Sequence, residues 1–150
     1  TISILLLGSG HKETEQQLAT LNSHADYNSF IGYDETLAHI IYAGADFLLM
    51  PSRVEPCGLN QMYALRYGTT PIVNSIGGLK DTVIDIEDGG YGICHDGVSI
   101  DKVTAAISKA ALFYTDKKRF QKNSRSILSI DYSWSHSAKE YVQLYKSLKL

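Results

Sequence analysis

A carboxylate and a thiol stand two residues apart in the segment from residue 51 to residue 68. Glu55 and Cys57 follow an apolar run that ends at Met50, and the pattern predicts that a helix begins at Gly58. In open α/β sheets, ligands bind at the carboxyl ends of the strands, and a helix N-terminus favours an anionic group. The segment is therefore expected to hold a phosphate-bearing ligand beside a carboxylate. An ordinary alternative for Glu55 is a surface charge that stabilises the start of a helix.

Hydrophobic patterns predict the elements that position this segment. Strands are expected over residues 2–7, 27–31, 45–50, 71–74 and 91–94. Helices are expected over 13–21, 34–43, 58–67, 100–114 and 117–130, and from about residue 133 to the C-terminus, with a helical turn near 80–85. Asp34 is the expected N-cap of its helix, Ser133 or Ser135 is the expected N-cap of the last helix, and Gly68 is the expected end of its helix. Alternation of this kind favours an α/β fold with a doubly wound, Rossmann-like parallel sheet, whose strand-to-helix loops share one edge.

Further ligand candidates fall in these loops. Gly77 and Gly78 are expected to form a loop after the strand at 71–74, and Tyr33 follows Gly32 at a strand end. The turn at residues 8–10 has two of the three glycines of a dinucleotide fingerprint, but Glu13 stands where the third belongs, which argues against NAD binding.

A dense set of short motifs lies between Ile31 and Asp85. The set comprises Glu55–Leu59, Gln61, Tyr63, Tyr67–Thr69, Pro71 and Gly77–Val83. In type and spacing these residues resemble the C-terminal domain of bacterial glycogen synthases and plant starch synthases. Members of that family are retaining glucosyltransferases that use ADP-glucose and have the GT-B fold. The likeness continues more thinly through Tyr132–Trp134.

The resemblance implies a role for each candidate residue. Glu55 would lie near the donor glucose and favour positive charge on its ring. The backbone at Gly58, Leu59 and Asn60 would face the donor phosphate, although Asn60 stands where the family commonly has threonine. Cys57 would be a small residue that lets the sugar approach, and not a nucleophile. Tyr33 would stack on adenine, and Gly77 and Gly78 would line the ADP-glucose site.

One difference from the wider class of retaining glycosyltransferases restricts the resemblance to a single branch of that class. Retaining glycosyltransferases of the wider class often carry a second glutamate eight positions after the first, and here that position is Tyr63. The glycogen and starch synthase branch shares this difference. A double-carboxylate mechanism of the glycosidase type therefore cannot be built from this loop.

The resemblance also predicts a domain arrangement. We expect residues 1–150 to be the C-terminal nucleotide-sugar-binding domain, incomplete at its N-terminus, with the N-terminal acceptor domain absent. The family's arginine and lysine that hold the donor pyrophosphate would precede Thr1. Each charged hydrogen bond is worth roughly 1.5–3 kcal/mol, so we expect the chain alone to bind ADP weakly and to transfer little or no glucose.

Composition limits the partners. The net charge of −2 gives no basic patch for nucleic acid, and no apolar run approaches a membrane span. The two cysteines and the histidines show no metal-ligand spacing, and the family needs no metal or organic cofactor. The expected partners are ADP-glucose or ADP and, through the missing domain, an α-1,4-glucan, in a cytoplasmic enzyme. The apolar stripe of the last helix, which includes Trp134 and Tyr145, is expected to mediate self-association.

Two alternatives stay open from the sequence. One is a related glycosyltransferase that uses UDP-glucose or another sugar nucleotide. The other is a truncated, non-catalytic nucleotide-binding module.

Overall fold

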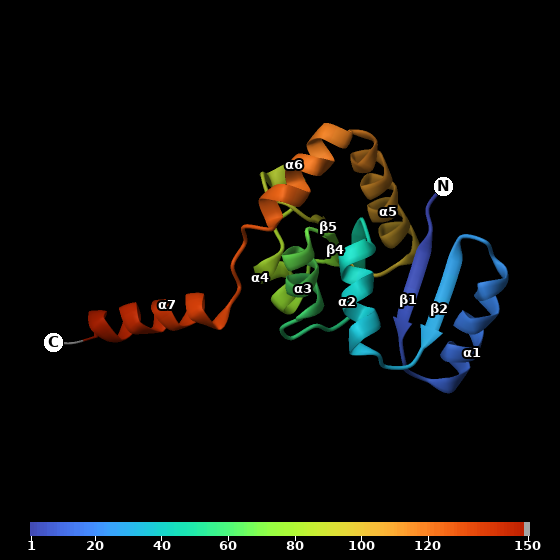
Figure 1. The fold of residues 1–150 in the computed structure, drawn as a ribbon, viewed down its shortest axis with the longest axis horizontal. Helices are drawn as coiled ribbons and strands as arrows, with labels where there is room; N and C mark the ends of the chain where they lie inside the picture. Colours follow the sequence, from blue (N-terminus) through green and yellow to red (C-terminus); the bar gives the residue numbers. More distant parts are fainter. Residues whose placement is uncertain (149–150) are drawn as a thin grey trace. The chain divides into compact units, whose positions relative to one another are not determined.

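The computed structural model describes residues 1–148 of the chain, which divides into two compact units, Thr1–Asp46 and Phe47–Leu150 (Figure 1). Within the described residues the strands form two parallel sheets, β1-β2 in the first unit and β3-β4-β5 in the second. The expected parallel α/β class is confirmed.

The first unit is a β-α-β unit followed by a helix. Its elements are β1 (Ile4–Gly8), α1 (Lys12–Thr20), the 3₁₀ turn η1 (Leu21–Ser23), β2 (Tyr27–Ile31) and α2 (Glu35–Gly44). The two strands are in register from the pair Ile4 and Tyr27 to the pair Gly8 and Ile31. Asp34 caps α2 as expected, because its Oδ1 accepts from the N–H of Leu37 at 2.9 Å.

The second unit is built around β4, all of whose residues are buried. Its elements are β3 (Phe47–Met50), α3 (Asn60–Tyr67), β4 (Thr70–Asn74), α4 (Gly77–Thr82), the 3₁₀ turn η2 (Ile86–Asp88), β5 (Ile93–His95), α5 (Ile100–Thr115), α6 (Lys117–Ile127) and α7 (Trp134–Ser147). Successive strand residues face opposite sides of a sheet. Val73 accordingly packs with Leu79 and Val83 of the α4 region, and Ile72 packs with Ala106 and Ala110 of α5.

The two last helices differ in burial. Phe120 of α6 is buried against an aromatic group, with its ring centroid 5.4 Å from that of Phe47 and 4.9 Å from that of Tyr114. The described part of α7 has no buried residue, although Ser133 caps it through its hydroxyl. The expected continuation of this helix over Lys149 and Leu150 lies outside the described residues.

Two expected boundaries near the candidate site are wrong. α3 begins at Asn60 and not at Gly58, because Gly58 has φ +72°, which no helical residue adopts. Gly77 and Gly78 open α4 and do not form a loop. The end of α3 is as expected, with Gly68 at φ +81° in the left-handed region.

Candidate functional site

Glu55 lies in the loop between β3 and α3, at the carboxyl end of the second sheet. Its side chain is half-buried, and the Ser52 hydroxyl donates to its Oε2 at 3.2 Å. The loop begins where β3 ends at Met50, so the buried strand fixes the start of the segment that carries the carboxylate. A carboxylate at this edge is placed to face a ligand.

The start of α4 packs directly against the Glu55 loop. The backbone N–H of Gly78 donates to the carbonyl of Glu55 at 3.1 Å. A Cβ on Gly77 would overlap the Glu55 carbonyl oxygen, and a Cβ on Gly78 would overlap that of Cys57. The two glycines are therefore required for close approach of the two backbones. The fold thus brings together Glu55, Cys57, Gly77 and Gly78, and the Gly78 N–H serves this contact and is not free for a ligand.

Gln61 also belongs to this site, although the sequence did not mark it as a ligand-binding candidate. Its side chain is fully buried, and Nε2 lies 3.0 Å from the carbonyl of Gly58, 3.3 Å from that of Cys57 and 3.0 Å from Thr82 Oγ1. Thr82 in turn donates to the carbonyl of Gly78 at 2.6 Å. Gln61 therefore links the Glu55 loop to α4. Its place in the motif next to Asn60 was the available signal, but nothing local shows that an amide there points inward.

The first turn of α3 presents backbone donors next to the same loop. Leu59 occupies the N-cap position and provides no side-chain cap, and both Leu59 and Asn60 are exposed. The first N–H groups of a helix lack intrahelical partners and carry the positive end of its dipole. This turn is thus the part of the site that suits a phosphate.

The two cysteines differ in environment. Cys57 is exposed at the site, whereas Cys94 of β5 is partly buried. Burial raises the pKa of the Cys94 thiol to about 11, and the charge of Asp85 acts in the same direction. Cys94 is therefore a neutral thiol at physiological pH and unsuited to nucleophilic chemistry.

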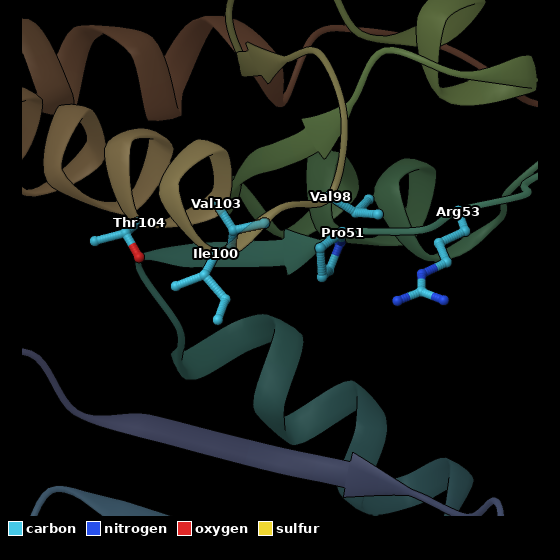
Figure 2. A pocket seen from close by; sticks show the side chains of 6 residues that line it. All are labelled: Pro51, Arg53, Val98, Ile100, Val103 and Thr104. Atoms are coloured by element: carbon cyan, nitrogen blue, oxygen red, sulfur yellow. The ribbon is translucent and has the colours of Figure 1, made fainter.

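A shallow hollow of about 360 Å³ lies beside the Glu55 loop within the second unit (Figure 2). Pro51 and Arg53 come from the loop after β3, Val98 from the loop after β5, and Ile100, Val103 and Thr104 from the start of α5. Arg53 forms no ion pair with any of residues 1–148. The hollow thus combines an apolar wall with one cation.

The candidates of the first unit gather at the ends of β1 and β2. The N–H of Gly32 donates to the carbonyl of Gly8 at 2.9 Å, and Tyr33 beyond it is 86% exposed. The N–H of Gly10 donates to Glu15 Oε1 at 2.7 Å. The chain's own carboxylate therefore occupies a donor that a dinucleotide phosphate would need, while the ring of Tyr33 is open for stacking.

Residues 1–148 contain no group of three or more His, Cys, Asp or Glu side chains arranged to hold a metal ion. Over the same residues, no helix combines the length and apolar character that crossing a membrane requires.

Comparison with known proteins adds to this geometry. Residues 2–127 match the family described as Glycosyl transferases group 1. The chain is 54% identical over 146 residues to a glycogen synthase of Flavobacterium johnsoniae, which covers 96% of the chain and 31% of that protein. It is 46% identical over 149 residues to a glycogen synthase of Thermodesulfovibrio yellowstonii, which covers 98% of the chain and 29% of that protein. The chain thus spans about a third of the length of these relatives.

A solved structure with a similar fold is the catalytic domain of starch synthase IV from Arabidopsis thaliana bound to ADP and acarbose. The TM-score is 0.86 and the identity 34%, over 97% of this chain and 32% of that one.

Proposed function

Because this chain belongs to the glycosyl transferases group 1 family, we propose that it provides the nucleotide-sugar site of a glycogen or starch synthase. The full-length enzyme transfers glucose from ADP-glucose to the non-reducing end of an α-1,4-glucan with retention of configuration. The identity of 54% to a glycogen synthase and the similarity to a starch synthase solved with ADP and acarbose support this choice.

In this proposal Glu55 acts on the donor sugar by charge. As the bond from the sugar C1 to the phosphate oxygen breaks, positive charge grows on the ring and ADP leaves with the electron pair. The acceptor hydroxyl oxygen bonds to C1 and gives its proton to the departing phosphate oxygen. A fixed carboxylate beside the ring stabilises that charge. The Ser52 hydroxyl on Oε2 and the Gly78 N–H on the backbone carbonyl hold Glu55 in place for this role.

The phosphate of ADP is held by the backbone. The segment from Gly58 through Asn60, which leads into α3, faces the phosphate that departs. Adenine stacking remains the role that the resemblance gives to Tyr33. Cys57 leaves room for the sugar beside Glu55. Gly77 and Gly78 line the site, where they pack closely against the backbone of the Glu55 loop.

The observation that carries the proposal is the packing of Gly77 and Gly78 against the carbonyls of Glu55 and Cys57. It joins two motifs, more than 15 residues apart in the chain, into one edge beside the uncapped start of α3. A carboxylate and free helix N–H groups then lie at one sheet edge, as a sugar phosphate requires.

We further propose that the rest of a longer protein supplies the glucan-binding domain, since the chain spans 31% of its Flavobacterium relative. The site then lies in a cleft between two domains. Self-association through α7 and a cytoplasmic setting belong to the same proposal. The exposed apolar face of α7 supports the first, and the free thiols of Cys57 and Cys94 fit the second.

The test is a transfer assay with the full-length protein that contains this chain, supplied with glycogen and labelled ADP-glucose or UDP-glucose. We expect transfer from ADP-glucose, α-configured product and loss of transfer in Glu55→Gln. A strong preference for UDP-glucose would support the UDP-sugar alternative, and no transfer from either donor would contradict the proposal.

A further inference from the structure

The side chain of Asn74 ties together the loops that follow β3 and β5. Asn74 is the last residue of β4 and is 6% exposed. Its Nδ2 donates to the Ser52 carbonyl at 2.8 Å, and its Oδ1 accepts from the Gly97 N–H at 2.8 Å. Both ends of the buried amide are thus satisfied, so the side chain has a defined orientation.

The link from Asn74 continues to the candidate catalytic carboxylate. The carbonyl of Ser52 is held by Asn74, and the hydroxyl of the same residue donates to Glu55 Oε2 at 3.2 Å. Glu55 Oε1 has no hydrogen-bond partner among residues 1–148. One carboxylate oxygen is therefore fixed by the protein, while the other remains for a ligand.

His95 anchors the opposite end of the link. It pairs with Asn74 in the parallel register of β4 and β5, and its Nδ1 lies 2.8 Å from the Gly97 carbonyl. A carbonyl oxygen can only accept, so Nδ1 carries the proton. Gly97 is then held at its carbonyl by His95 and at its N–H by Asn74, in a left-handed conformation with φ +91°.

We propose that Asn74 and Ser52 are positioning residues that set the orientation of the Glu55 carboxylate, with the loop after β5 as their anchor. The inference rests on the proposed function, because it assigns these residues through the action of Glu55. The stabilising effect of a carboxylate on a developing charge depends steeply on its placement, and displacement by about 1 Å can cost roughly 100-fold in rate. A residue two hydrogen bonds away can thus control turnover without touching the substrate.

Three variants of the full-length protein separate positioning from packing. Ser52→Ala removes the hydroxyl that holds Glu55, and Ser52→Thr retains it. Asn74→Asp keeps the size and the acceptor for Gly97 but places a carboxylate oxygen against the Ser52 carbonyl. We expect kcat to fall about 10-fold or more in Ser52→Ala and Asn74→Asp. The KM for ADP-glucose should change less than about threefold, since Glu55 acts chiefly in the transition state, and Ser52→Thr should recover most of the activity.

Asn123→Asp is the matched control. Asn123 also bridges backbone and side chain in the second unit, with Nδ2 3.0 Å from the Tyr91 carbonyl and 3.1 Å from Thr70 Oγ1, but Thr70 is at the opposite end of β4. We expect this variant to lose stability and to keep its kcat. An equal loss of kcat in Asn123→Asp and Asn74→Asp, or full activity in Ser52→Ala, would overturn the inference.

A second measurement keeps the inference independent of the proposed function. The ¹³C resonance of the Glu55 carboxyl group is recorded by NMR in the 150-residue chain and in the same variants. We expect it to move in Ser52→Ala and Asn74→Asp and to stay in place in Asn123→Asp. An unmoved Glu55 resonance in Asn74→Asp overturns the positioning role even where transfer is observed, whereas absence of transfer in the wild type contradicts only the proposed function.

Discussion

The backbone N–H of Gly78 donates to the backbone carbonyl of Glu55 at 3.1 Å, so the first turn of α4 and the carboxylate loop form one rigid edge. A side chain on Gly78 would overlap the Cys57 carbonyl, which makes this contact dependent on glycine. The relation between these two residues explains why a substitution in α4 is expected to affect Glu55.

Gly78→Ala is predicted to destabilise the protein by about 1–3 kcal/mol, because the added methyl group forces the two backbones apart. Urea unfolding measures the change. Gly44→Ala is the control, since a Cβ there meets no atom within 4 Å and the residue has no left-handed φ. A Gly78→Ala protein as stable as Gly44→Ala would show that the close approach is not required.

Gln61→Leu is predicted to cost about 1–3 kcal/mol of unfolding free energy, since it removes a buried donor shared by Gly58, Cys57 and Thr82. Gln17→Leu on the exposed surface of α1 should change stability by less than about 0.5 kcal/mol. Chemical denaturation measures the unfolding free energy of both variants. Equal stabilities would contradict the role of Gln61 in linking the Glu55 loop to α4.

Asp85 is predicted to make stability depend on acid pH. Burial acts to raise its pKa, but hydrogen bonds from the Cys94 and Glu87 N–H groups and from Lys109 outweigh burial, and the pKa lies below its ordinary value of 3.8. A group whose pKa is lowered by folding stabilises the native state above the unfolded pKa. That stability is lost as pH falls from about 3.8 through the lower folded value.

The check is the unfolding free energy of wild type and Asp85→Asn between pH 7 and pH 2. We expect Asp85→Asn to be less stable by about 1–3 kcal/mol near neutral pH and the difference to shrink below pH 3.8. Asp81→Asn, which changes an exposed carboxylate, is the control. A difference that is constant down to pH 2 would show that Asp85 does not titrate with folding.

Cys57 is predicted to react with iodoacetamide far faster than Cys94 at pH 7.5, because Cys57 is exposed and the pKa of Cys94 is about 11. Mass spectrometry of partly alkylated protein gives both rates. ADP-glucose should slow the alkylation of Cys57 alone, since it is expected to bind beside this thiol. Faster labelling of Cys94 would be incompatible with the structure.

α7 is predicted to mediate self-association, because Trp134 and Tyr145 are 85% and 64% exposed on an apolar stripe. Sedimentation velocity should show concentration-dependent association in the wild type and its loss in Trp134→Ser/Tyr145→Ser. Gln143→Ser, on the same helix, should associate like the wild type. A wild type that stays monomeric at high concentration would refute this role.

Local chemistry made much of the fold predictable. The span of β2, the cap Asp34 and the left-handed Gly68 each depend on a few neighbouring residues, and the structure shows all three. Of the two serines expected at the start of the last helix, Ser133 is the cap. The order in which the strands pair depends on contacts between distant residues, so the sequence alone did not predict it.

The sequence predicted the motifs of the candidate site, but not the side-chain hydrogen bonds that connect them. The sequence singled out Glu55 and the two glycines, but glycine is a poor helix former, so the start of α4 at Gly77 was missed. Asn74 and Gln61 act through side-chain contacts across 22 and 21 residues of chain, and no local pattern reveals such contacts. The roles of Tyr33, Leu59 and Asn60 at the ligand stay predictions.

The most direct test of the central claim is a ¹⁵N NMR titration of the 150-residue chain with ADP-glucose, with UDP-glucose as the comparison. We expect saturable shifts of the amides from Gly58 through Met62, which are larger with ADP-glucose than with UDP-glucose and are altered in Glu55→Gln. Shifts that saturate elsewhere, or none at several millimolar ligand, would contradict the claim that this edge is the nucleotide-sugar site.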